Sequence, residues 1–322
     1  MSLSFARLRI WLLLALLMVV AAFGYSRVIA GHNGFDLSES TIPAEKILPG
    51  GPPKDGIPSI DNPVFESAAQ ASWLKAEDRV LGLAYNGHYR AYPLAILNWH
   101  EVVNDEVAGD PVTITYCPLC GTGVAYKSLI NGKRVEFGVS GLLYNSDVLL
   151  YDRESQSLWS QLKHQAISGP MKGTALDPLP LQLAPWKQWR EKYPQTQVLS
   201  RDTGHHRDYS RSPYADYDQN QHIYFPVEFL SKRYHPKERV LGLQLAGGFK
   251  AYPFAELAKL QAEGEAEFSD SFNGIELTVR FNAQQRTGQV FHNNGNEIPV
   301  VNSFWFAWYG FHPQTDIFIH NP

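Results

Sequence analysis

The segment Arg79-Val-Leu-Gly-Leu-Ala-Tyr-Asn-Gly-His-Tyr-Arg-Ala-Tyr-Pro93 occurs a second time, in related form, 160 residues further along the 322-residue chain. The second copy reads Arg239-Val-Leu-Gly-Leu-Gln-Leu-Ala-Gly-Gly-Phe-Lys-Ala-Tyr-Pro253. From Arg79 to Leu97, 11 of 19 positions are identical at this offset. An internal match of this density is typical of a duplicated structural unit. The sequence therefore predicts a chain built from two related halves.

The repeated segment predicts a β-hairpin followed by a helix. Val80–Tyr85 and His88–Tyr92 have the β-branched and aromatic content of strands. Asn86-Gly87 between them supplies the two positive-φ positions of a type I′ turn, and Gly247-Gly248 is predicted to do the same in the second copy. The proline that closes the segment suits the first position of a helix, which we expect to run to about Val103.

The rest of the chain is β-prone and rich in turns. Hydrophobic residues make up 44% of the chain and aromatic residues 13%, which is enough for a packed core. These features predict an α+β fold that is β-dominated, with internally duplicated β-hairpin–helix–sheet units behind an N-terminal signal or anchor segment. The predicted organisation is a signal peptide or signal anchor at 1–30, a linker at 31–56, a first repeat with the cysteine loop at 57–200, a polar connection at 201–222 and a second repeat at 223–322.

The N-terminus has the composition of an export signal. Arg7 and Arg9 precede an apolar run from Ile10 to Gly24, and Val28-Ile29-Ala30 is an acceptable cleavage site. The run is somewhat short for a membrane-spanning helix, which needs about 20 apolar residues. We expect either a signal peptide or an uncleaved signal anchor. The protein is then periplasmic, or it is anchored in the cytoplasmic membrane and faces outward.

The charge of the exported part excludes some classes of partner. Removing Arg7, Arg9 and Arg27 from the 28 basic residues leaves 25 against 32 acidic ones, a net charge of −7. An acidic chain of this kind is not expected to bind nucleic acid or an anionic membrane surface. Membrane attachment is expected only through the N-terminal segment, if that segment stays uncleaved. A protein or small-molecule partner is left undefined by the sequence.

The two cysteines of the chain lie in Tyr116-Cys-Pro-Leu-Cys-Gly-Thr-Gly123, between a β-prone run and a Gly-Thr-Gly turn. A pair at this spacing can form a disulfide, exchange electrons or bind a soft metal. Export favours the disulfide, because exported proteins meet an oxidising compartment. The Cys-Pro-Leu-Cys-Gly pattern also has the form of a metal-binding turn, in which a glycine provides the permissive backbone angle.

A metal bound here needs further ligands from elsewhere, since the chain has no second cysteine pair. Our leading hypothesis is a copper or zinc site with Cys117 and Cys120 as thiolate ligands and His100 as the third ligand. Glu101 and Asp147 are candidates for supporting positions around these ligands. No catalytic residue can be assigned, and whether the protein is an enzyme is left open.

The second copy of the repeat serves as a comparison for this site. At the 160-residue offset, Cys117 and Cys120 fall opposite Leu277 and Arg280, and His100 has no histidine opposite it. Residues found in one copy only are not required by the shared fold. The cysteines and the histidine are therefore interpreted as additions to the first half.

Two alternative functions remain open. One is a non-catalytic envelope binding or structural module whose cysteines form a stabilising disulfide. The other is a thiol-dependent redox enzyme. Thiol exchange normally places the pair at a helix N-terminus, where the helix dipole lowers the thiol pKa, whereas this pair is predicted to precede a strand.

Longer motifs accompany the cysteine pair. They are Ile96-Leu-Asn-Trp-His-Glu-Val-Val-Asn-Asp105, Thr115-Tyr-Cys-Pro-Leu-Cys-Gly-Thr122, Phe137-Gly-Val-Ser-Gly-Leu-Leu-Tyr-Asn-Ser-Asp147, Leu158-Trp-Ser160, Leu199-Ser-Arg-Asp-Thr-Gly204 and His235-Pro-Lys-Glu-Arg239. In these motifs the chain resembles the domain of unknown function 3179 family, which consists of exported or membrane-anchored bacterial and archaeal proteins. The resemblance runs from about Ile57 to the C-terminus. It implies that Trp99-His100-Glu101 and the cysteine loop belong to one family signature, and it implies no activity.

Overall fold

The computed structural model describes residues 32–260 and 265–320, and their fold is α+β and β-dominated, as predicted. The predicted signal or anchor segment at 1–30 lies outside the described residues. Within residues 32–260 and 265–320, no helix has the length and apolar character needed to cross a membrane.

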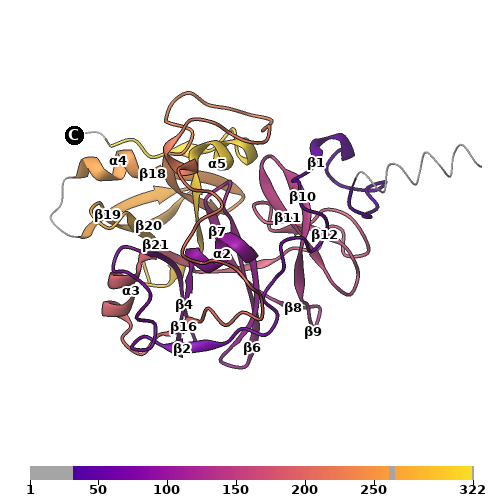
Figure 1. The fold of residues 1–322 in the computed structure, drawn as a ribbon. Helices are drawn as coiled ribbons and strands as arrows, with labels where there is room; N and C mark the ends of the chain where they lie inside the picture. Colours follow the sequence, from indigo (N-terminus) through magenta and orange to yellow (C-terminus); the bar gives the residue numbers. More distant parts are fainter. Residues whose placement is uncertain (1–31, 261–264, 321–322) are drawn as a thin grey trace, which may run out of the picture.

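Each copy of the repeated segment forms a hairpin followed by a short helix (Figure 1). In the first copy the elements are β3 (Arg79–Tyr85), β4 (His88–Pro93) and α2 (Leu94–His100); in the second they are β17 (Arg239–Leu245), β18 (Gly248–Pro253) and α4 (Phe254–Leu257), continued by η3 (Ala258–Leu260). The strand register is the same in both hairpins, since Val80 pairs with Pro93 and Val240 with Pro253. The two helices begin directly after these prolines.

The first hairpin turns at Asn86-Gly87, where φ is 48° and 77°. The second turns at Ala246-Gly247, with φ of 49° and 76°, and not at Gly247-Gly248 as predicted. Gly248 pairs with Leu245 as the first residue of its strand, which moves the turn back by one residue.

The similarity between the halves continues through a three-stranded meander. It consists of β5 (Val102–Val107), β6 (Asp110–Cys117) and β7 (Thr122–Lys127) in the first half, and β19 (Glu265–Phe272), β20 (Ile275–Asn282) and β21 (Thr287–His292) in the second. Cys117 pairs with Thr122 across one turn, and Asn282 pairs with Thr287 across the other. The two turns therefore have the same length and the same position in the meander.

This register corrects the predicted correspondence between the halves. The offset from Cys117 to Asn282 is 165 residues, so the constant offset of 160 misplaces this region by five. Cys117 and Cys120 correspond to Asn282 and Gln285. The inference that the second half has no thiols at this turn is unchanged.

A strand, a helix and a strand close each half. They are β15 (Gln182–Pro185), α3 (Trp186–Lys192) and β16 (Gln197–Leu199), and β23 (Val300–Phe304), α5 (Trp305–Phe311) and β24 (Asp316–Ile317). In the first half Trp189 packs on Gly82, and in the second Trp308 packs on Gly242; a Cβ atom on either glycine would lie 2.2 Å from the indole. Each indole N–H donates to a threonine hydroxyl seven residues later, at 2.9 and 3.0 Å. The sequence prediction missed this part of the repeat.

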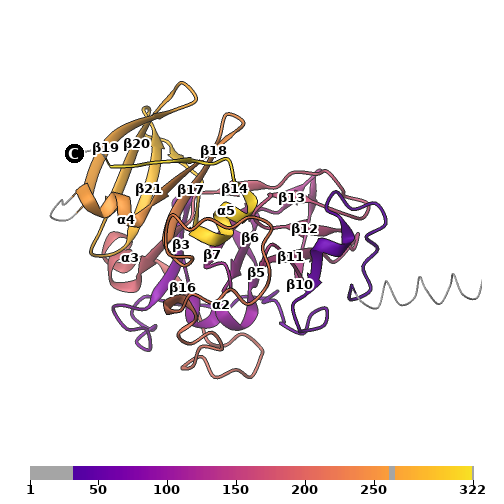
Figure 2. The same ribbon diagram turned by 90° about the horizontal axis from the view of Figure 1, so that it is seen from above.

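The strands join into sheets that cross between the halves. The strand orders are β15-β3-β4-β16-β2, with β2 at Phe65–Ser67; β24-β18-β17-β23-β7-β6-β5, with β14 (Asp177–Leu179) paired to β7; and β19-β20-β21-β22, with β22 at Glu297–Ile298. Asn302 of β23 pairs with Gly123 of β7, so one sheet contains strands of both halves. Figure 2 shows the strands of the second half beside those of the first, with α5 near the middle of the molecule.

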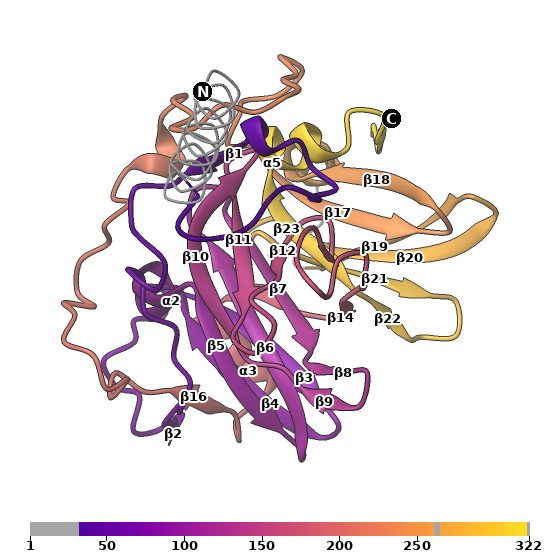
Figure 3. The ribbon, with the colours of Figure 1, turned by 90° about the vertical axis from the view of Figure 1, so that its right-hand side faces the viewer.

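The first half contains a further sheet, here called the inserted sheet, that has no counterpart among the described residues of the second half. This part of the first half contains β8 (Leu129–Ile130), β9 (Lys133–Arg134), β10 (Phe137–Tyr144), β11 (Asp147–Asp152), β12 (Leu158–Ser160) and β13 (Gln165–Ala166). The strands β10 to β13 form a sheet of order β1-β10-β11-β12-β13, with β1 at Ile47–Pro49, on the side of the molecule that faces the viewer in Figure 3. The inserted sheet packs against the cysteine turn.

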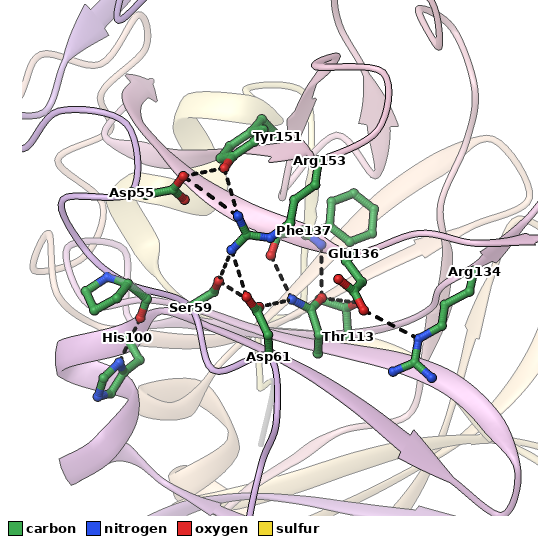
Figure 4. A network of polar contacts seen from close by, with 12 residues as sticks. Asp55, Ser59, Asp61, His100, Thr113, Arg134, Glu136, Phe137, Tyr151 and Arg153 are labelled. Carbon is green, nitrogen blue, oxygen red and sulfur yellow. Dashed lines mark hydrogen bonds and ion pairs between the residues drawn. The ribbon is translucent and has the colours of Figure 1, made fainter. Parts of the chain in front are cut away.

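The segment expected to be a linker at 31–56 packs on this inserted sheet. It contributes η1 (Ala44–Lys46) and β1 (Ile47–Pro49), which pairs with β10, and its apolar side chains are buried: Phe35, Leu37, Ile42 and Ile47. Arg153, which follows β11, binds Asp61 at 2.9 Å and Ser59 at 2.7 Å (Figure 4). These contacts attach the start of the first half to the inserted sheet. The predicted domain boundaries themselves stay predictions.

Candidate metal centre

Both cysteines lie in the tight turn between β6 and β7. Cys117 is the last residue of β6, Cys120 lies in the turn, and both are buried free thiols. Gly121 follows with φ of 60°, and a Cβ atom on it would lie 2.9 Å from the Phe304 ring. The glycine thus provides both the backbone angle and the room that the turn needs against β23.

Asp147 reaches the cysteines from the inserted sheet. The β10–β11 hairpin turns at Asn145-Ser146, where φ is 49° and 65°, and Asp147 is the next residue. The thiols of Cys120 and Cys117 donate to the Ser146 carbonyl oxygen at 3.2 and 3.7 Å. One ligand atom from each of Cys117, Cys120 and Asp147 lies within 4.8 Å of the others, and all three residues are buried. This set can hold a metal ion.

The hairpin turn that carries Asp147 is anchored by its own polar side chains. Asn145 donates to the Gly310 carbonyl at 3.0 Å and accepts from the Glu228 N–H at 2.8 Å. Ser146 donates to the Phe225 carbonyl at 2.6 Å. The turn is therefore held by residues of the second half of the chain.

Glu101 completes the acidic surroundings of the site. The helix α2, expected to reach Val103, ends at His100, because Glu101 adopts φ of 58° and the chain turns into β5. A positive φ at a buried glutamate is uncommon and is the kind of local strain found at functional sites. The Glu101 carbonyl accepts from the Tyr116 N–H at 2.7 Å, so this residue is fixed directly beside the cysteine turn.

Burial favours the protonated forms of the acidic groups of this site. It raises the pKa of Glu101 to about 8, with a further contribution from the Asp147 charge. It raises the pKa of Asp147 to about 7, against the opposing effect of the Leu162 and Val148 N–H groups. The pKa of each of the two thiols is also raised by burial. A cation would favour the ionised form of all of these groups.

One oxygen of Asp147 has no hydrogen-bond partner within the described part of the chain. Oδ2 accepts from the Leu162 N–H at 3.1 Å, whereas Oδ1 is buried and unpaired. A buried polar atom without a partner costs about 1–3 kcal/mol. The free Oδ1 therefore leaves room for a further interaction in the same place where the thiols gather.

The structure places His100 outside this group. Its Nδ1 donates to the Pro58 carbonyl at 2.7 Å (Figure 4), and its Nε2 accepts from the Tyr209 hydroxyl at 2.7 Å. Burial lowers the pKa of His100 to about 4, so the imidazole is neutral. Both ring nitrogens are occupied, and the residue that joins the cysteines is Asp147. The proposed ligand role of His100 is not supported by this arrangement.

Two tyrosines from the predicted polar connection cover the site. Tyr217 belongs to the buried apolar cluster that contains both cysteines, and Tyr214 packs against that cluster. Tyr217 begins η2 (Tyr217–Gln219), and its backbone is held by Lys237, whose ammonium donates to the carbonyls of Tyr217, Asn220 and His222 at 2.7, 3.0 and 2.8 Å. Sequence reasoning missed these residues. The close spacing of the two tyrosines in a polar segment was the one feature of the sequence that could have indicated their role.

Comparisons with known proteins add a family and no activity. Residues 54–296 match the family model described as "Protein of unknown function (DUF3179)". This range includes Glu101, both cysteines and Asp147. No curated protein and no solved structure matches the chain.

Proposed function

The chain belongs to the DUF3179 family, whose description states no function, and we propose from its buried site that it is an exported or membrane-anchored protein that binds zinc through Cys117, Cys120 and Asp147. The observation that carries the proposal is the convergence of these three ligand atoms within 4.8 Å in a buried position. Glu101 is the candidate for the fourth position.

The electrostatics support a bound cation over an empty site. Two thiols and two carboxyls in one buried place can ionise together only beside a compensating positive charge. The unpaired Asp147 Oδ1 and the strained Glu101 backbone both occur at this spot. A bound metal ion would give the Asp147 Oδ1 a partner. Its binding would also offset the cost of the strained Glu101 backbone.

The ligand set favours zinc over copper. Zinc accepts cysteine, histidine and carboxylate ligands in tetrahedral sites. Cu(I) is selected by soft thiolate and thioether ligands, which a carboxylate is not. The sequence analysis allowed both metals, because it took the His100 imidazole as the third ligand. With the Asp147 carboxylate as the third ligand instead, we favour zinc.

Among the alternatives, redox exchange finds the least support. The thiols lie at a strand end, and their pKa values are raised, whereas exchange needs an accessible thiolate. A disulfide between Cys117 and Cys120 remains the competing state for an exported protein. Its formation would remove the metal ligands.

We also propose that the two halves arose by duplication and that the metal ligands were added to the first half. The matching strand registers support the duplication. The cysteines replace Asn282 and Gln285 of the second half, and Asp147 belongs to an insertion. The metal ligands are thus not needed for the fold that both halves share.

The test is a zinc and Cu(I) titration of the reduced full-length protein against a chromophoric chelator. The proposal predicts one tightly bound zinc per chain, lost in the Cys117→Ser/Cys120→Ser variant. Equal zinc binding by the variant would refute it, as would a stable Cys117–Cys120 disulfide in protein isolated from the envelope. The Lys133→Ser variant, which changes an exposed hairpin, is the control for zinc lost during purification and should bind zinc as wild type.

A further inference from the structure

A cavity of about 500 Å³ lies beside the cysteine turn at the seam between the two halves. Pro118, which stands between the two cysteines, lines it together with Tyr116, Tyr214 and Phe304. Cavities of this volume are of the size that accommodates small organic ligands. The site is distinct from the proposed metal ligands, whose side chains are not among its lining residues.

Three arginines converge on this cavity from both halves. Arg79 and Arg239 are corresponding residues of the repeated segment, and Arg286 lies in the turn that corresponds to the cysteine turn. Arg79 donates to the Gln285 carbonyl at 2.8 Å, across the seam. Arg239 donates in the opposite direction to the Gly121 carbonyl at 2.7 Å. The pseudo-symmetry of the chain therefore brings like charges together.

The charges of these guanidinium groups are only partly compensated, because Asp218 acts on Arg239 from an exposed position. None of the three forms an ion pair with a carboxylate of residues 32–260 or 265–320, and the acidic residues that line the cavity, Asp216 and Asp218, are exposed. Burial, followed by the charges of Arg239 and Arg286, lowers the pKa of Arg79 to about 10. The cluster is positive although the whole chain carries a net charge of −4.

Lys237 also lines the cavity but does not add a free donor. Its ammonium makes three hydrogen bonds to backbone carbonyls, which use its three protons. An incoming ligand would therefore meet the arginines. Arg79 and Arg239 each use one Nη1 proton in these hydrogen bonds to backbone carbonyls, and a guanidinium has five N–H donors.

We propose that this cavity binds a small organic anion whose phosphate or carboxylate group is held by Arg79, Arg239 and Arg286. Guanidinium groups match both oxyanions in geometry, and they bind them in pairs of parallel hydrogen bonds. Apolar lining from Leu94, Pro118 and Phe304 suits the organic part of the ligand. The ligand would rest beside the cysteine turn, and its binding does not require the metal.

The experiment is calorimetric titration of the full-length protein with inorganic phosphate, glycerol 2-phosphate and citrate at constant ionic strength, with chloride as the reference. We expect saturable binding of at least one probe, weakened about tenfold or more in Arg79→Gln and Arg286→Gln. Binding of the two phosphates alone identifies a phosphate site, and binding of citrate alone identifies a carboxylate site. Arg134→Gln, an exposed arginine paired with Glu106 outside the cavity, is the matched control and should bind as wild type.

Arg286 is exposed, so its variant is expected to fold even if Arg79→Gln is unstable. Far-ultraviolet circular dichroism of each variant checks the fold before titration. The proposal is overturned if none of the three probes binds better than chloride, or if Arg286→Gln binds every probe as tightly as Arg134→Gln does.

Discussion

Asp147 is the residue that distinguishes a metal centre from a plain cysteine pair in this protein. Its carboxyl lies with both thiols in a buried group, and its Oδ1 has no other partner among the residues described. His100, adjacent to Glu101 in the chain, is turned instead toward Pro58 and Tyr209. The two candidate third ligands can therefore be separated by mutation.

We predict that Asp147→Asn lowers zinc affinity by roughly 100-fold, since loss of a ligand should cost at least as much as loss of a supporting residue. His100→Gln should leave zinc affinity close to that of wild type. Competition titration with a chromophoric chelator measures both. The reverse order, with His100→Gln the weaker binder, would restore the histidine as a ligand and remove Asp147.

Glu101 predicts an unusual pH dependence of stability in the metal-free protein. Its pKa rises from 4.5 to about 8 on folding, so between these values the folded state holds a proton that the unfolded state has released. The contribution of this group to the free energy of unfolding is therefore lost as pH rises through that window. Metal-free Glu101→Gln should exceed wild type by on the order of 2 kcal/mol at pH 8.5, and by much less at pH 5.

Urea unfolding in the presence of a chelator, at pH 5 and pH 8.5, measures this difference. The matched control is Glu106→Gln on the neighbouring strand, whose side chain is exposed. It should gain no stability at the higher pH. A Glu101→Gln variant that is less stable than wild type at both pH values would contradict the assignment of Glu101 as a buried, destabilising acid.

At the scale of the element, the cysteine turn depends on Gly121. Alanine there must adopt φ of 60° and place its Cβ atom 2.9 Å from the Phe304 ring. Gly132, in the β8–β9 turn, also has a positive φ of 76°, but nothing lies within 4 Å of its Cβ position. We expect Gly132→Ala to cost about 1 kcal/mol from backbone strain, and Gly121→Ala to cost a further 1–3 kcal/mol from overpacking.

Thermal or urea unfolding of the two variants makes this comparison, because the backbone penalty is common to both. If they lose equal stability, the close contact between the turn and β23 is not a constraint. Gly121→Ala should also weaken zinc binding, since displacement of the turn moves Cys120.

Local turn chemistry explains which elements could be predicted from the sequence. Asn86-Gly87 and the Cys-Pro-Leu-Cys-Gly turn occur where expected, because short-range residue preferences decide them. The end of α2 was missed, since a glutamate rarely adopts a left-handed conformation. The same turn of the backbone at Glu101 separates the directions of His100 and Glu101, which is why the predicted histidine does not meet the cysteines.

The third ligand could not be predicted for a different reason. Asp147 is 27 residues from Cys120 and reaches it through the packing of an inserted sheet on the meander. No local pattern encodes such a contact. The correspondence between the halves was likewise misplaced, because five residues are gained between the hairpin and the meander of the second half.

At the scale of the whole molecule, the described residues form two halves with matching strand registers, and the first half contains an additional sheet. The shared elements form most strands of the other sheets, and the seam between the halves lies beside the cysteine turn. The inserted sheet supplies Asp147, and the connection between the halves supplies the covering tyrosines. The proposed metal site is thus built from parts in which the two halves differ.

Export is the prediction that belongs to this scale, and it depends on residues 1–30, which lie outside the described structure. Alkaline phosphatase fused to the C-terminus should be active in cells, because this enzyme folds only after export to an oxidising compartment. Leu14→Arg/Leu17→Arg, which interrupts the apolar run, should abolish that activity. Equal phosphatase activity with and without the substitutions would place the signal elsewhere.

The central claim concerns the atoms around the metal, and zinc K-edge X-ray absorption of the zinc-loaded full-length protein tests it most directly. The account predicts two sulfur ligands at about 2.3 Å and oxygen ligands at about 2.0–2.2 Å, without the multiple scattering of an imidazole. A shell without sulfur, or one with a clear imidazole signature, would contradict it.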